Sequence, residues 1–233
     1  MDKKKILVII MMTLLIVISG VTILNNKNTS TKEVNKDSIK FKKEYESLNG
    51  KSAKYQDQSF AYLNVEIPKD NNIKYLKTKD IVNHLTTGTQ IIYFGSATCN
   101  WCRAAIPILL DVAKENNIEN IYYYDFFELR DKYENDTSKE AVETYEKIIE
   151  ILDKHIDKTF PETSNKKGKK RLSAPFVVFI RNGSVVGTHY KTLESHTEYT
   201  KNLSTKQKEE LKKIYQELTD KMLASVCTID HEC

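Results

Sequence analysis

The chain has 233 residues, and with 40% hydrophobic and 29% charged residues it has the composition of a packed domain, which excludes a disordered or fibrous protein. Its formal net charge of +4 is spread along the sequence. The basic cluster at residues 166–171 lies outside any nucleic-acid-binding motif and is typical of a solvated loop, so we expect no nucleic-acid partner.

The N-terminus predicts a membrane segment. Lysines at positions 3–5 precede an uncharged, mostly apolar run from Ile6 to Leu24, which at about 1.5 Å per residue crosses most of a bilayer core of roughly 30 Å. Because basic flanks stay in the cytoplasm, the rest of the chain is expected on the extracytoplasmic side. No small-residue cleavage motif follows, which favours a retained single-pass anchor in the cell membrane; cleavage would instead give a secreted protein. Residues 1–24 would then be the anchor or signal segment, 25–36 a polar tether, and 37–233 one domain.

Hydrophobic periodicity and turn residues predict an alternation of helices and strands through this domain. Asp37 is expected to cap the first helix, Thr137 with Glu140 and Ser204 with Gln207 form candidate capping boxes, and Asn182-Gly183 is a strong hairpin signal. In chain order the predicted elements are a helix at 37–50, a strand at 62–67, a helix at 78–85, a strand at 90–95, a helix after Cys99, a strand at 120–126, a helix at 137–156, strands at 176–181 and 184–189, and a helix from 204.

All four cysteines follow the apolar run, as the pairs Cys99 with Cys102 and Cys227 with Cys233. In the cytosol such pairs are typical of metal ligands or catalytic thiols, whereas the even count and the outward topology favour disulfides. His231 lies between the second pair, but three ligands are too few for a closed zinc site. We therefore expect no metal, and a small structural disulfide between Cys227 and Cys233.

The segment from Ile91 to Ala113 resembles the active-site segment of the thioredoxin family, because a strand runs into C-x-x-C at a helix start and Pro107 stands where the family has its helix-kinking proline. Residues 174–183 resemble the family's cis-proline loop, strand and hairpin. The resemblance covers roughly residues 80–190, with an interruption. It implies a thioredoxin-like three-layer α/β/α sandwich, with a helical insertion at about 128–171 before the cis-proline strand and the N-terminal transmembrane helix in front.

The position of the first pair predicts its chemistry. At a helix N-terminus Cys99 gains a lowered thiol pKa, which makes it the candidate nucleophile. Cys102, one turn further on, is the candidate resolving thiol. The resemblance implies that Pro175 is cis and lies against the pair, and that the backbone of Ala174 binds an extended substrate. Trp101 either contacts substrates or simply fills the helix start.

Two departures from the thioredoxin pattern leave the direction of electron flow open. The family has a buried acid six residues before its first cysteine, and here that position is Tyr93, a poor base with a reference pKa near 10. The dipeptide between the cysteines, which tunes the reduction potential in this family, is Asn100-Trp101 rather than Gly-Pro.

Together these features predict a membrane-tethered thiol-disulfide oxidoreductase that needs no cofactor. It would exchange disulfides with protein or peptide thiols on the extracytoplasmic side and would depend on a redox partner that the sequence does not identify. One alternative is an accessory protein dedicated to one exported peptide, similar to the bacterial bacteriocin transport accessory proteins. The other is a non-catalytic binding module. For the insertion, we favour a helix packed on the core over a substrate platform.

Overall fold

A computed structural model describes residues 35–55 and 58–224. The predicted anchor at residues 6–24 and the pair Cys227 and Cys233 lie outside the described residues. Within the described ranges, none of the helices has the length and apolarity needed to span a membrane.

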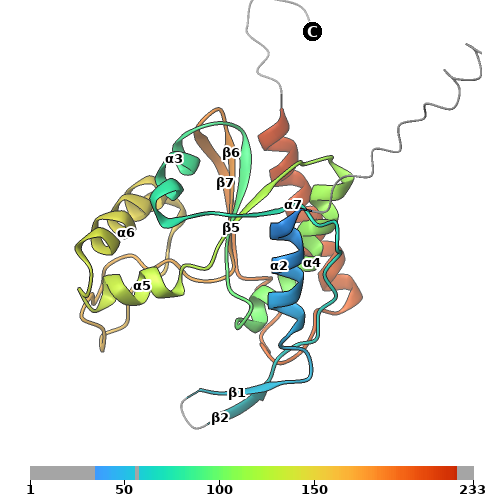
Figure 1. The fold of residues 1–233 in the computed structure, drawn as a ribbon, viewed down its shortest axis with the longest axis horizontal. Coiled ribbons are helices and arrows are strands. Elements are labelled where there is room, and N and C mark those ends of the chain that lie inside the picture. Colours follow the sequence, from blue (N-terminus) through green and yellow to red (C-terminus); the bar gives the residue numbers. More distant parts are fainter. Residues whose placement is uncertain (1–34, 56–57, 225–233) are drawn as a thin grey trace, which may run out of the picture. The chain divides into compact units, whose positions relative to one another are not determined.

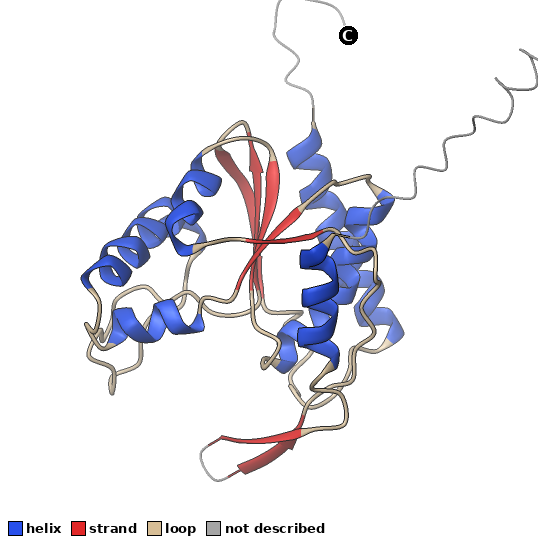
Figure 2. Cartoon of the chain, viewed as in Figure 1, coloured by secondary structure: helices blue, strands red, loops and turns tan. Residues whose placement is uncertain are grey.

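The described chain is a mixed α/β domain built on one five-stranded sheet (Figures 1 and 2). The strand order is β3-β5-β4-β6-β7; β3 and β4 both run parallel to β5, while β6 runs antiparallel to β4 and β7 antiparallel to β6. A separate two-stranded hairpin, β1-β2, projects away from the sheet in Figure 1. The strands are β1 (Ser52–Tyr55), β2 (Gln58–Ala61), β3 (Ile73–Tyr75), β4 (Gln90–Phe94), β5 (Ile121–Tyr124), β6 (Phe176–Arg181) and β7 (Ser184–Tyr190).

Helices cover both faces of the sheet, with α2, α4 and α7 on one side and α3, α5 and α6 on the other (Figure 1). Two clusters of buried apolar side chains correspond to these two faces. Successive residues of a strand point to opposite faces, so β4 sends Tyr93 into one cluster and Phe94 into the other. The helices are α2 (Lys36–Glu46), α3 (Ile81–Thr86), α4 (Asn100–Glu115), α5 (Phe127–Glu134), α6 (Lys139–Leu152) and α7 (Thr205–Leu223), with short 3-10 turns at Thr78–Asp80 and Asp153–His155.

The strongest local signals of the sequence are confirmed. Asn182 and Gly183 connect β6 to β7 with φ values of 49° and 75°, the left-handed conformation that a tight hairpin turn requires. The capping box of Ser204 and Gln207 begins α7. The helix after Cys99 is α4, whose buried face includes Ile106 and Leu109.

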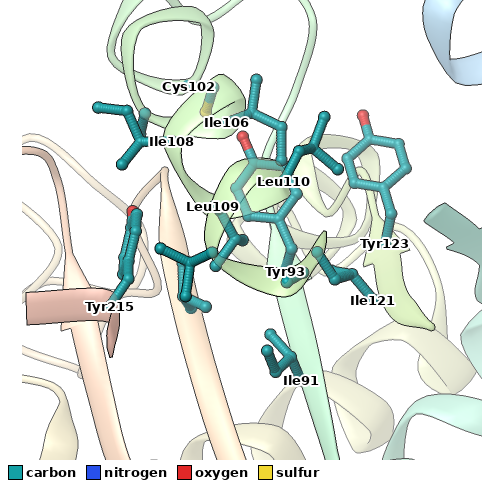
Figure 3. Close-up of a cluster of buried hydrophobic side chains, with 14 of the residues drawn as sticks. Ile91, Tyr93, Cys102, Ile106, Ile108, Leu109, Leu110, Ile121, Tyr123 and Tyr215 are labelled. Atoms are coloured by element: carbon teal, nitrogen blue, oxygen red, sulfur yellow. The ribbon is translucent and has the colours of Figure 1, made fainter. Parts of the chain in front are cut away.

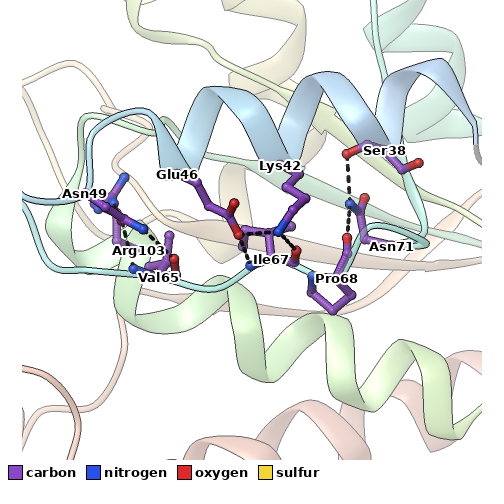
Figure 4. Close-up of polar contacts among 9 residues, drawn as sticks. All are labelled: Ser38, Lys42, Glu46, Asn49, Val65, Ile67, Pro68, Asn71 and Arg103. Atoms are coloured by element: carbon purple, nitrogen blue, oxygen red, sulfur yellow. Dashed lines mark hydrogen bonds and ion pairs between the residues drawn. The ribbon is translucent and has the colours of Figure 1, made fainter.

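The strand predicted at 62–67 is wrong. Leu63, Val65 and Ile67 are buried in alternation, but the segment pairs with no strand of the described sheets. Side chains of α2 and the turn after it bind its backbone instead (Figure 4): Asn49 donates to the Val65 carbonyl at 2.8 Å, and the Ile67 N–H donates to Glu46 at 2.8 Å. Alternating burial requires only an extended backbone. The N–H and C=O groups of that backbone can be hydrogen-bonded by side chains as well as by a neighbouring strand.

Two predicted caps are shifted. Asn35, rather than Asp37, caps α2, and Asp37 instead accepts a hydrogen bond from the Tyr75 N–H. Ser138, rather than Thr137, caps α6, accepting a hydrogen bond from the Ala141 N–H at 3.2 Å. Each observed cap lies within two residues of the predicted one, because several residues near each helix start can cap and the sequence alone does not distinguish them.

The insertion at about 128–171 contains two helices, α5 and α6, where the sequence predicted one. Helix α6 buries Ala141, Tyr145, Ile148 and Leu152 against the second core cluster. Helix α6 is therefore packed on the core, in agreement with the interpretation that the sequence favours.

Candidate functional site

Cys99 and Cys102 lie where the central strand β4 passes into helix α4. Cys99 is the N-cap of α4, in an extended conformation, and its sulfur accepts a hydrogen bond from the Cys102 N–H at 3.4 Å. Cys99 is partly exposed and Cys102 is fully buried, and both are free thiols. The helix start therefore leaves Cys99 partly exposed at the edge of the core cluster and places Cys102 inside it.

The pKa of Cys99 is lowered from the usual value of a thiol. The largest cause is a hydrogen bond from the Cys102 side chain, and the backbone N–H groups of Cys102 and Trp101 act in the same direction. Burial opposes them. The amides at the helix start thus contribute as expected, but the neighbouring thiol contributes more.

The pKa of Cys102 is raised well above the usual value, first by burial and then by its hydrogen bond to Cys99. The backbone of Ser96 and the hydroxyl of Tyr93 act in the opposite direction. The two pKa shifts have opposite signs, and since only a thiolate is a good nucleophile, the arrangement favours Cys99 over Cys102 as the candidate nucleophile.

The Ala174-Pro175 peptide bond is cis, as the resemblance implies. The Cys99 thiol lies 3.9 Å from the Ala174 carbonyl oxygen, so the loop before β6 lies against the Cys99 sulfur. The Lys191 N–H donates to the Pro175 carbonyl at 2.8 Å and ties the same loop to the end of β7.

Trp101 and Asn100, the dipeptide between the cysteines, have different surroundings. The Trp101 ring is half-buried, edge-on to His196 with centroids 4.8 Å apart, and the Lys191 ammonium lies 4.1 Å from its centroid. Asn100 is buried; it accepts from the Leu63 N–H at 2.9 Å and donates to the Ala61 carbonyl at 3.0 Å. Trp101 therefore lies near the candidate site, whereas Asn100 binds the backbone of residues 61 and 63, where the extended segment 62–67 begins.

Arg103 is a buried cation that the sequence analysis missed. It is only 1% exposed, and its guanidinium donates to the carbonyls of Leu63, Tyr45 and Ala97 and to the Asn49 side chain, contacts that Figure 4 shows in part. All four acceptors are neutral. The sequence does contain a sign of this burial: Arg103 is the only charged residue between Cys102 and Asp111, in an otherwise apolar stretch of helix.

A cleft of about 740 Å³ opens beside the cis-proline loop. Ser173 and Phe176, on either side of that loop, line it together with Lys191. The end of the insertion reaches the same cleft through Ile156 and Lys158. The insertion therefore both packs on the core and forms part of a surface next to the candidate site.

No group of three or more His, Cys, Asp or Glu side chains that could hold a metal occurs in residues 35–55 and 58–224. Cys227, His231 and Cys233 lie outside those ranges. No protein-family model matches the chain, and no curated protein matches its sequence.

Proposed function

We propose that this protein is a thioredoxin-like thiol-disulfide oxidoreductase that exchanges disulfides with protein or peptide substrates through Cys99 and Cys102. The observation that carries the proposal is the inequality of the two thiols. Cys99 is partly exposed with a lowered pKa, and Cys102 is buried one helical turn away with a raised pKa. A nucleophile and a resolving thiol require this division of roles.

The topology supports the same proposal. Cys99 follows the central strand of the five-stranded sheet, and Pro175 precedes the antiparallel neighbour β6, so the sheet brings the two loops together. Helices on both faces agree with the three-layer arrangement that the resemblance implies. In the proposed complex, the backbone of Ala174 binds an extended substrate next to Cys99.

The proposed reaction has two balanced exchanges. The Cys99 thiolate attacks one sulfur of a substrate disulfide, which forms a mixed disulfide and releases the other substrate sulfur as a thiolate that takes up a proton. Cys102 then loses its proton and attacks the Cys99 sulfur, so the Cys99–Cys102 disulfide forms and the second substrate thiol leaves. Run in reverse, the same steps oxidise a substrate dithiol. The reduction potential of the pair, relative to that of its redox partner, decides the direction.

The proposed location is the extracytoplasmic side of the membrane, with residues 6–24 as a single-pass anchor. This part of the proposal depends on the lysines at 3–5 and the apolar run that follows them.

The test is a trapping experiment with the full chain. Cys102→Ser should accumulate mixed disulfides through Cys99 because attack proceeds while resolution is blocked, and non-reducing gels with peptide mass mapping would identify the linkage. Cys99→Ser is the matched control and should give no adducts. Adducts formed only by Cys99→Ser would mean that the nucleophile is misassigned, and a non-catalytic binding module would give none with either variant. A single captured partner would favour the dedicated accessory protein over a general exchanger.

A further inference from the structure

The surroundings of Cys102 are rich in phenolic hydroxyl groups. The titratable groups that interact electrostatically with its sulfur include Cys99 at the start of the same helix, Tyr93 from β4, Tyr45 from α2 and Tyr215 from α7. All three tyrosines are fully buried in the core cluster that contains Cys102. Figure 3 shows the hydroxyl end of Tyr93 directed toward the part of α4 that carries Cys102.

The Tyr93 hydroxyl is held in place from two sides. It lies 3.1 Å from the Tyr45 hydroxyl in a buried hydrogen bond. A Cβ atom added at Gly95 would lie only 2.5 Å from the Tyr93 Cζ and hydroxyl oxygen, so the phenol occupies space that only glycine leaves free. Arg103 fixes Tyr45 in turn, donating to the Tyr45 carbonyl at 2.8 Å.

We propose that the Tyr93 hydroxyl donates a hydrogen bond to the Cys102 sulfur and stabilises the thiolate that forms in the resolving step, with Tyr45 as its positioning residue. In this arrangement the Tyr45 hydroxyl donates to the Tyr93 oxygen, which leaves the Tyr93 proton directed at Cys102. The inference rests on the proposed function, since it assigns Tyr93 a role in the second exchange.

The proton balance of this step does not require Tyr93 to ionise. Cys102 loses one proton, and the departing substrate thiolate gains one, directly or through water. Burial raises the pKa of Tyr93 well above its ordinary value, so the phenol keeps its proton at neutral pH. Tyr93 therefore acts as a donor to the thiolate, in contrast to an acid at this position, which would accept the proton.

The hydroxyl of Tyr215, in the same core cluster as Cys102, is a second observation that supports this role for the cluster. In the described part of the chain, it is one of two buried side-chain polar atoms that have no hydrogen-bond partner. A buried hydroxyl without a partner is costly in a core, and a thiolate at Cys102 would interact electrostatically with this hydroxyl. This observation agrees with a pocket that stabilises a charge formed only during reaction.

The test separates the two exchanges by rapid mixing of the purified, reduced full-length protein with an aromatic disulfide that releases a coloured thiolate. Cys227 and Cys233 are replaced by Ser throughout, so that Cys99 and Cys102 are the two thiols that react. The first release reports attack by Cys99 and the second reports resolution by Cys102. Tyr93→Phe should slow the second phase roughly tenfold at pH 7, as expected for a lost hydrogen bond to a charged group, and should move its pH profile upward. The first phase should change by less than about twofold, since Tyr93 is directed at Cys102.

Tyr45→Phe should slow the second phase in the same direction by a smaller factor. Tyr123→Phe is the matched control, because Tyr123 stacks on Tyr93 with centroids 5.6 Å apart while its own hydroxyl donates to Glu44 at 3.1 Å. It should leave the second phase unchanged.

A folded Tyr93→Phe protein that resolves at the native rate with the native pH profile would overturn the inference, as would an equal loss in Tyr123→Phe. If Tyr93→Phe does not fold, a native second phase in Tyr45→Phe would overturn it. Absence of the first phase in the native protein would contradict the proposed function instead.

Discussion

Replacing the buried Arg103 by Met should destabilise the domain by about 2–3 kcal/mol. The substitution removes four hydrogen bonds from the guanidinium to neutral oxygens, of which three are backbone carbonyls. Two of these oxygens keep a second donor, the Leu48 N–H on the Tyr45 carbonyl and the Val65 N–H on the Asn49 side chain. Each lost partner costs about 1 kcal/mol, which gives about 4 kcal/mol in total. Relief from burying an unpaired charge, together with the packing of the Met side chain, returns about 1–2 kcal/mol.

Equilibrium urea unfolding of the full-length protein in a membrane mimetic, followed by tyrosine and tryptophan fluorescence, measures this difference. With a slope of about 2 kcal/mol per molar urea, the midpoint should fall by roughly 1 M. Arg103→Lys keeps the charge but lacks the planar guanidinium with its several N–H donors. Its unfolding midpoint should therefore lie between those of the native protein and Arg103→Met. A midpoint for Arg103→Met at or above that of the native protein would refute the reasoning, because desolvation of the guanidinium would then outweigh its four hydrogen bonds.

Two further predictions concern ionisation and topology. Alkylation of Cys99 in Cys102→Ala, followed over pH 5 to 10, should lose the hydrogen bond from the Cys102 thiol, so the midpoint should lie above that of Cys99 in the native protein. An equal or lower midpoint would contradict this hydrogen bond as the main cause of the lowered pKa. Protease added to intact protoplasts should digest the domain, and a protein recovered wholly in the soluble cytosolic fraction would contradict the expected anchor and compartment.

The features that sequence analysis predicted well have causes that lie close together in the chain. The hairpin at Asn182-Gly183 needs only a turn that tolerates positive φ, and the capping box at Ser204 and Gln207 spans three residues. The placement of Cys99 at the start of α4 follows in the same way from the apolar strand before it and the apolar face after it. Such signals are readable because the partners are fixed by spacing alone.

The features that sequence analysis missed depend on partners far apart in the chain. Arg103 bonds to residues 40 and 58 positions away, Leu63 and Tyr45, and no periodicity connects them. The segment at 62–67 alternates like a strand, yet side chains of α2 and α4 bind its backbone. Strand β3 has only three residues, too few for an alternating pattern to be distinguished.

The resemblance to the thioredoxin family begins at about residue 80, but the candidate site does not. Helix α2 contributes Tyr45, whose hydroxyl contacts Tyr93 and whose carbonyl binds Arg103. Phe41 and Tyr45 of α2 belong to the same core cluster as Cys102, and burial is the largest cause of the raised Cys102 pKa. The difference between the two thiols therefore depends partly on a helix outside the recognisable motif. We therefore expect a protein shortened to the region of resemblance to keep C-x-x-C and the cis-proline loop but to lose the contacts of Tyr45 to Tyr93 and Arg103.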